Sequence, residues 1–294
     1  MLNPGVLLPC AAQAGGSMSA VSRTAGRDRT SIQVIAHRGS SEDAPEHTLS
    51  AYKRALDDGA DALECDVRLT KDGHLVCVHD RRVDRTSNGR GVLSTLELAE
   101  LSALDFGSWR DTWEDFEDPE VPDRDRAEIL TLRKLLEMVA SHDRQVELAI
   151  ETKHPTRYAG LVERRLVDLL DHFGWAHPRL GRTSPVRVMS FSQLSLRRMR
   201  VAAPSVQTVF LMERVPLRYR DGTLPPGVRI AGPSIEVLRA HPRYVERVQR
   251  NGHEVHVWTV DGAEDVALCR DLGVDAIITN RPRRVLDALG RRAP

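Results

Sequence analysis

Five charged or titratable side chains lie at the predicted ends of three strand-like segments near the start of the chain. Segments 34–40, 63–69 and 76–80 contain apolar residues typical of strands that are buried in a sheet. The polar residues within them are His37, Arg38, Glu64, Asp66 and His79. Such groups are costly to bury unless a partner compensates them. Together they indicate acid–base chemistry on an anionic substrate, assisted by a hard metal ion.

The acidic residues of this group have the spacing of a cation site. Glu64 and Asp66 are two positions apart on a predicted strand, so their side chains point to the same face. Glu151 ends the apolar run 146–151 and is a third candidate ligand for Mg²⁺ or Ca²⁺, which both prefer carboxylate oxygens. Two alternatives to a cation site remain. Glu64 and Asp66 would form salt bridges to arginines, and Glu151 would form a surface ion pair with Lys153. Lys153 can also add positive charge for a phosphate.

His37 and His79 are the candidate acid–base pair, because imidazole titrates near neutral pH. Cleavage of a phosphodiester requires one group to activate the nucleophile and another to protonate the leaving oxygen. Asp80 and Glu46 are candidates for orienting these imidazoles. Arg38 can form two parallel hydrogen bonds with a phosphate.

Strand-like and helix-like segments alternate from residue 32 onward, which predicts an α/β fold of the TIM (β/α)8 barrel class. The predicted strands are 33–36, 62–69, 146–151, 186–191, 207–211, 228–231, 255–260 and 276–279. The predicted helices are 49–58, 132–141, 158–173, 193–202, 242–251, 263–272 and 282–289. An open doubly wound sheet is the alternative, but the glycine-rich loop usual after its first strand is missing. Catalytic groups in a barrel come from the C-terminal ends of several strands, where these candidates lie.

Two segments interrupt this alternation after the second predicted strand. The turn signal at 71–73 predicts a hairpin over 69–78. Segment 105–128 is acidic, lacks periodicity and is expected to be an insertion above the barrel. It either covers the substrate or is a solvated loop anchored by its aromatic residues, Trp109, Trp113 and Phe116.

The composition narrows the possible partners. The 294 residues include 42 Lys and Arg and 42 Asp and Glu, and this neutral balance argues against a nucleic-acid partner. No apolar run approaches the roughly 20 residues needed to span a bilayer, so we expect no stable membrane insertion and a cytoplasmic protein. The four cysteines are scattered without a C-x-x-C pair, which predicts reduced thiols rather than a zinc site.

Residues 1–31 are predicted to be a disordered leader, and 32–294 the barrel domain. The leader is rich in Ala, Gly and Ser and shows no periodicity. Segment 6–10 faintly resembles a lipoprotein cleavage site, but no basic region precedes it and its apolar stretch is short for a signal peptide. Met18 is an alternative start.

Several short motifs resemble those of the glycerophosphodiester phosphodiesterase family, and they occur in order from residue 34 to 282. They are HRG at 37–39, PEHT at 45–48, ECDVR at 64–68, DGHLVCVHD at 72–80, RTSNG at 85–89, ETK at 151–153, VMSF at 188–191, VWTV at 257–260 and GVDAIITNRP at 273–282. The resemblance implies a TIM-barrel enzyme that uses a divalent cation and releases glycerol 3-phosphate from a small glycerophosphodiester.

The resemblance also implies roles for individual residues. Glu64, Asp66 and Glu151 would be the metal ligands, and His37 and His79 the catalytic pair. Arg38 and Lys153 would contact the phosphate. Glu46 would support the metal site, and Trp258 would form part of the substrate cavity. Two positions depart from the usual motifs: His47 replaces the asparagine of P-E-N-T, and Asn280 replaces the aspartate of T-D-x-P.

Two alternative functions remain from the sequence. A lysophospholipase D would use the same site on a long-chain substrate, and a non-catalytic barrel would only bind a phosphate ligand. The sequence leaves the oligomeric state open.

Overall fold

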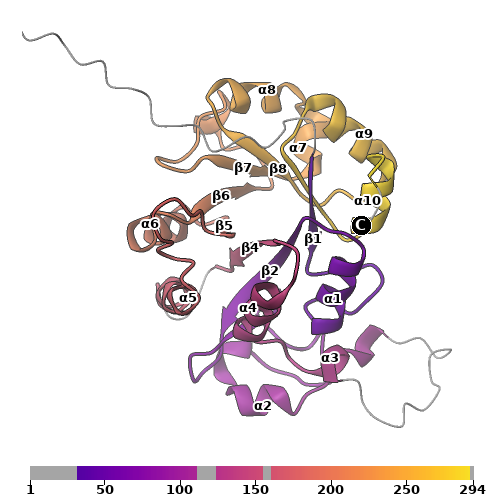
Figure 1. The fold of residues 1–294 in the computed structure, drawn as a ribbon, viewed down its shortest axis with the longest axis vertical. Helices are drawn as coiled ribbons and strands as arrows, with labels where there is room; N and C mark the ends of the chain where they lie inside the picture. The colour runs from indigo at the N-terminus through magenta and orange to yellow at the C-terminus, as the bar shows by residue number, and fades with distance from the viewer. Residues whose placement is uncertain (1–31, 111–123, 155–159, 292–294) are drawn as a thin grey trace, which may run out of the picture. The chain divides into compact units, whose positions relative to one another are not determined.

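The computed structural model describes residues 32–110, 124–154 and 160–291. In this part of the chain, eight parallel strands close into a barrel (Figure 1), which confirms the predicted TIM-barrel class. In order around the ring, the strands are β1 (Gln33–His37), β2 (Ala62–Leu69), β4 (Glu147–Thr152), β5 (Val186–Ser190), β6 (Gln207–Met212), β7 (Ile230–Pro233), β8 (Glu254–Val257) and β9 (Ala276–Thr279). β9 pairs with β1 and closes the ring. The predicted leader, Trp113 and Phe116 lie outside the described residues.

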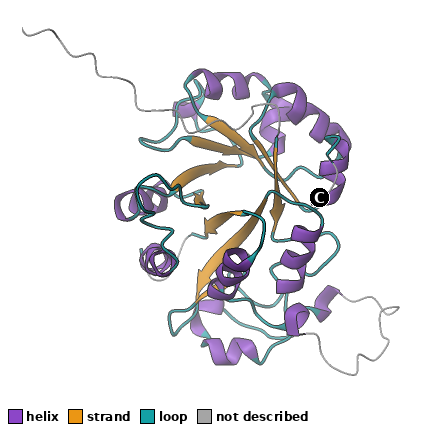
Figure 2. Cartoon of the chain, in the orientation of Figure 1, coloured by secondary structure: helices purple, strands orange, loops and turns teal. Residues whose placement is uncertain are grey.

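Helices lie around the outside of the strands (Figure 2). They are α1 (Leu49–Asp57), α4 (Leu132–Ser141), α5 (Leu161–His172), α6 (Gln193–Ala202), α7 (Ile235–Ala240), α8 (Arg243–Arg250), α9 (Ala263–Leu272) and α10 (Pro282–Ala288). Side chains cap several of them: the Thr48 hydroxyl accepts a hydrogen bond from the backbone N–H of Ala51 at the start of α1. No helix among the described residues has the length and apolar character needed to cross a bilayer.

Several elements differ from the prediction, among them β8, which spans Glu254–Val257 rather than 255–260. The strand expected at 228–231 corresponds to β7, which spans Ile230–Pro233 and so includes Gly232 and Pro233. Both pair with β6, and a Cβ on Gly232 would lie 2.7 Å from the Leu211 side chain, so the tight barrel interior requires glycine here. Helix α7 was not predicted, since its six residues are too few to show helical periodicity.

The barrel interior is filled by apolar side chains from alternate strand positions. These residues are Ile35, Ala62, Ala149, Met189, Val209, Leu211, Ile230, Ala276 and Ile278. The intervening positions, such as Val34 and Leu63, pack in separate apolar clusters with helix residues. Because this plug fills the centre, polar side chains that point inward are confined to the two ends of the barrel.

A hairpin extends the barrel beyond β2. β3 (Leu75–Cys77) pairs antiparallel with the end of β2, which confirms the expected hairpin, and α2 (Leu98–Ser102) and α3 (Arg124–Ala127) follow it. The hairpin region has its own small core, formed by Val76, Val78, Val83, Leu93, Leu101, Phe106 and Ile129. In the described part of the expected insertion, the Arg85 guanidinium lies over the Trp109 ring, 6.0 Å from the ring centroid. Arg110 donates a 2.6 Å hydrogen bond to the carbonyl of Ala44, so this segment contacts the loop after β1.

A buried polar network occupies the N-terminal end of the barrel, opposite the candidate site. Arg187 forms an ion pair with Glu147 and donates a 2.7 Å hydrogen bond to Gln33. His256 lies 3.3 Å from the same guanidinium. Burial lowers the pKa of His256 to about 4, and the hydrogen bond that its ring donates to Glu254 only partly offsets this effect.

The low pKa of His256 predicts acid sensitivity of the fold. The unfolded chain binds a proton at this residue near pH 6.5, whereas the folded chain does so near pH 4, so stability falls as the pH drops between these values. Replacement of His256 by Gln should reduce the loss of unfolding free energy between pH 7 and pH 4.5 by on the order of 2 kcal/mol, as measured by urea denaturation. An equal pH dependence in the variant and the wild type would contradict this, and the exposed His241→Gln serves as control.

Candidate active site

Three carboxylates from two neighbouring strands meet at the C-terminal end of the barrel. Glu64 and Asp66 come from β2 and Glu151 from β4, where Asp66 and Glu151 are paired in register. Oxygen atoms from the three residues lie within 4.8 Å of one another, and all three side chains are buried. The structure therefore brings together the three acidic residues that the sequence singled out.

The electrostatics of this cluster show that it needs further positive charge. Burial and the neighbouring Asp66 raise the pKa of Glu64 well above its usual range, and the same two causes raise the pKa of Glu151 to about 7. Burial would also raise the pKa of Asp66, but the hydrogen bond from His47 and the charge of Lys153 hold it well below its usual range. A divalent cation would favour the ionised form of all three groups, and an all-oxygen donor set suits Mg²⁺ or Ca²⁺.

Two cationic side chains border the carboxylates. The Arg38 guanidinium lies 3.0 Å from Oδ2 of Asp66 and 3.0 Å from Oε1 of Glu46. The Lys153 ammonium lies 3.1 Å from Oδ1 of Asp66 and 2.9 Å from Oε1 of Glu151. Both predicted phosphate contacts thus stand at the mouth of the barrel, next to the candidate cation site.

His37 is held through one ring nitrogen. Nδ1 donates a 2.8 Å hydrogen bond to the amide oxygen of Asn280, whose own amide nitrogen donates to Asp261. Nε2 lies 4.0 Å from the Glu64 carboxylate and points toward the cluster. Burial and the Arg38 charge lower the pKa of His37 to about 4, so its imidazole is neutral at pH 7 with Nε2 as a proton acceptor.

His79 has the same arrangement with a different partner. Nδ1 donates a 2.7 Å hydrogen bond to the Asp80 carboxylate, which in turn accepts a hydrogen bond from Arg85. Arg68 fixes the backbone of this residue by donating two hydrogen bonds to the His79 carbonyl. The His79 ring is about one-third exposed, and its Nε2 remains available at the mouth of the barrel.

The contacts of Glu46 differ from those expected, since this residue was a candidate for orienting a histidine. Burial would raise its pKa, but hydrogen bonds from Arg85 and the charge of Arg38 lower it to about 2. In the described part of the chain, it has no hydrogen bond to His37 or His79, and it positions Arg38 instead. Asp80 does orient His79, as expected.

Trp258 lies on the other side of the mouth, directly after β8. Its ring nitrogen donates a 2.7 Å hydrogen bond to the carbonyl of Gly232, and its ring meets Phe191 edge to face with centroids 5.5 Å apart. The site thus has a charged half and an aromatic half.

Sequence reasoning did not assign roles to Arg85, Asn280 and Arg68. Arg85 lies in the motif at 85–89, and Asn280 was noted only as a departure from the family pattern. Their contacts depend on the folded chain, so the sequence carried no direct signal for them.

The fold and the site define an α/β-barrel enzyme with acid–base groups beside a cluster of carboxylates. Comparison with known families gives a specific match. The glycerophosphoryl diester phosphodiesterase family model matches residues 37–284. A Mycobacterium tuberculosis protein named probable glycerophosphodiester phosphodiesterase 1 is 46% identical over 253 residues, which cover 85% of this chain and 90% of that protein. The chain therefore belongs to this family and is a phosphodiesterase, which rules out the non-catalytic barrel.

A second relative agrees with this assignment, and a solved structure shares the fold. The glycerophosphodiester phosphodiesterase of Caldanaerobacter subterraneus is 34% identical over 261 residues, covering 86% of this chain and 96% of that protein. An Oleispira antarctica phosphodiesterase, solved in complex with the product sn-glycerol-3-phosphate, has the same fold with a TM-score of 0.75 and 24% identity. That match covers 88% of this chain and 96% of the Oleispira chain.

The contact between Asn280 and His37 predicts a defect in catalysis rather than in binding. Replacement of Asn280 by Leu keeps the size of the side chain but removes the oxygen that orients His37. We expect kcat to fall about 10²-fold, since misplaced catalytic groups commonly cost this much, while KM changes little. Steady-state kinetics with Asn251→Leu as a surface control measure both constants. A kcat within threefold of the wild type would contradict the assignment.

Proposed function

We propose that the protein hydrolyses small glycerophosphodiesters to glycerol 3-phosphate and an alcohol, with a divalent cation held by Glu64, Asp66 and Glu151. One observation carries this proposal: three buried carboxylates and two histidines with available Nε2 atoms lie at the same barrel mouth. The family match and the names of the relatives support the substrate class.

The charged half of the site suits a phosphodiester. A bound cation would supply positive charge against the phosphate oxygens. Arg38 can donate hydrogen bonds to a phosphate, and Lys153 adds a further charge. Both are already held by the carboxylates, so they need little reorganisation as negative charge grows on the phosphate.

The partners of the two histidines suggest different roles for them. His37 donates to a neutral amide, which does not stabilise an imidazolium, so we propose that it is the base that takes the proton of the nucleophile. Burial lowers the pKa of His79, but the hydrogen bond that it donates to the Asp80 carboxylate opposes this effect and favours its protonated form, so we propose that it gives a proton to the departing alkoxide. The nucleophile is either water or the neighbouring glycerol hydroxyl; the second route gives a cyclic phosphate that water then opens.

The aromatic residues of the site are relevant to the size of the substrate that it accepts. Trp258 and Phe191 offer an apolar wall to the glycerol or the alcohol. Phe191, Leu194 and Leu217 are exposed on the segments that follow β5 and β6, at the same end of the barrel. These exposed apolar side chains favour a second candidate, a lysophospholipase D whose substrate carries an acyl chain. The water-soluble diester remains the primary proposal because the relatives carry that name.

The proposed cation predicts reversible loss of activity. Release of glycerol 3-phosphate from glycerophosphocholine and glycerophosphoethanolamine should stop after treatment with EDTA and return with Mg²⁺ or Ca²⁺. An enzyme-coupled assay of glycerol 3-phosphate measures this, with lysophosphatidylcholine as a parallel substrate. Activity that survives complete chelation would contradict the cation site, and turnover of the lysophospholipid alone would favour the second candidate.

The proposed proton transfers predict different responses to the leaving group. His37→Ala and His79→Ala should each lose about 10²–10⁴-fold in rate on glycerophosphocholine. On a glycerophosphodiester of p-nitrophenol, whose anion leaves without being protonated, His79→Ala should recover most of its activity and His37→Ala should not. The exposed His172→Ala serves as control. Recovery by His37→Ala alone would reverse the two roles, and near-normal turnover of either variant on both substrates would exclude that residue from catalysis.

A further inference from the structure

His47 lies beside the carboxylate cluster and has no part in the mechanism above. We propose that His47 is a positioning residue that holds the Asp66 carboxylate in place and thereby sets the affinity of the site for its cation. This inference rests on the proposed function, since it takes Asp66 as a cation ligand.

Both ring nitrogens of His47 have partners. Nε2 lies 2.9 Å from Oδ2 of Asp66 and donates to it, because an ionised carboxylate can only accept. Nδ1 lies 2.8 Å from the hydroxyl of Tyr52 and, in the neutral imidazole, accepts its hydrogen bond; the same hydroxyl oxygen lies 3.0 Å from the backbone carbonyl of Glu64. A single connected path thus runs from α1 to two positions of β2 that both carry candidate ligands.

This path is buried and its backbone is constrained. His47 is 5% exposed and Tyr52 is fully buried, so water competes little for these hydrogen bonds. His47 has a φ of +63°, in the left-handed region, and its N–H donates to the carbonyl of Arg38. Thr48 caps α1 directly after it. The imidazole is therefore held in one position and does not move with the Asp66 carboxylate if that carboxylate rotates.

The contacts of Asp66 show what this support achieves. Oδ2 faces His47 and the Arg38 guanidinium, 3.0 Å away, while Oδ1 lies 3.1 Å from Lys153, on the side of Glu151. Without His47, Oδ2 would lose one of its two partners, and only the flexible side chains of Arg38 and Lys153 would hold the carboxylate. The partners that orient ligand side chains commonly contribute 10- to 100-fold in metal affinity.

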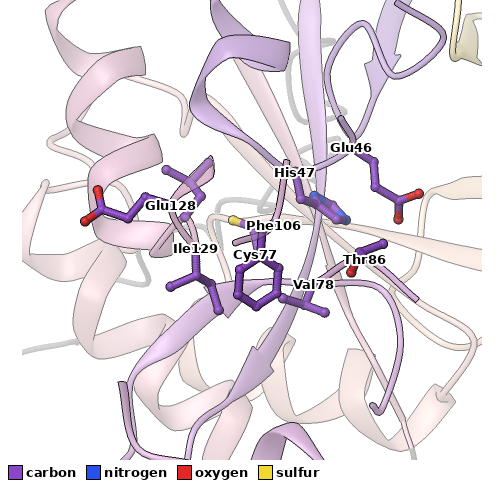
Figure 3. Close-up of a pocket in the computed structure, with 9 residues that line it drawn as sticks. Glu46, His47, Cys77, Val78, Thr86, Phe106, Glu128 and Ile129 are labelled. Carbon is purple, nitrogen blue, oxygen red and sulfur yellow. The ribbon is translucent and has the colours of Figure 1, made fainter. Parts of the chain in front are cut away.

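The surroundings of His47 suggest suitable replacements. Its side chain helps to line a small cavity, with Cys77, Val78 and Phe106 among the other lining residues (Figure 3). An aromatic ring without nitrogen can keep the contacts with these apolar residues while it loses the polar contacts with Asp66 and Tyr52. Asparagine, the usual residue of the family motif at this position, tolerates the positive φ but carries a shorter side chain with one amide. It can support Asp66 or reach Tyr52, but not both.

Cation binding to the full chain tests this role directly. Isothermal titration calorimetry with Mg²⁺ and with Ca²⁺, after removal of bound ions, should show about 10- to 100-fold weaker binding for His47→Phe. His47→Asn should lie between this variant and the wild type. Tyr52→Phe, which removes only the hydroxyl, should weaken binding roughly 3- to 10-fold. The exposed His241→Phe controls for the substitution itself.

Kinetics distinguish positioning from a general loss of structure. The cation concentration that gives half-maximal activity should rise in His47→Phe by the same factor as the dissociation constant, and kcat at saturating cation should recover to within a few-fold. A folded His47→Phe that binds the cation within twofold of the wild type would overturn the inference and leave the proposed function intact. If that variant does not fold, unchanged affinity in Tyr52→Phe overturns it. A wild-type protein that binds neither cation would overturn the cation site itself.

Discussion

Concentrated negative charge at the C-terminal end of β2 and β4 is the constraint on which the rest of the site depends. Three buried carboxylates within 4.8 Å of one another repel, and burial adds to the cost of ionising them. The neighbouring groups offset this cost: Arg38 and Lys153 contribute positive charge, and His47 donates a hydrogen bond. The proposed cation would complete the same balance, so the proposed metal and phosphate sites would share one electrostatic arrangement.

Closure of the barrel brings groups from distant segments to these carboxylates. β1 pairs with both β2 and β9, which brings Asn280 to His37 across 243 positions of the chain. The apolar side chains in the barrel interior confine these groups to the mouth, while a separate polar network around Arg187 occupies the opposite end. The hairpin after β2 supplies His79 from outside the ring, so the two histidines approach the site from different layers.

Much of this could be predicted from the sequence because strand patterns and their polar ends are local features. The positions of Glu64, Asp66 and Glu151 follow from alternation along a strand. The structure differs where packing between strands decides the outcome. Gly232 and Pro233 lie beyond the expected strand but belong to β7, and Gly232 sits where the tight interior leaves little room for a side chain. Glu46 was expected to orient a histidine, yet it pairs with Arg38 and Arg85.

The sequence by itself determined the fold class, the chemical types at the site and the family, because these depend on residue identity and on spacing along single strands. The tertiary structure decided how those residues are partnered. It placed Asn280 rather than Glu46 beside His37, and it showed that His47 bridges Tyr52 and Asp66. These contacts join segments that are distant in the chain, and only the closed ring of strands sets the distances between them.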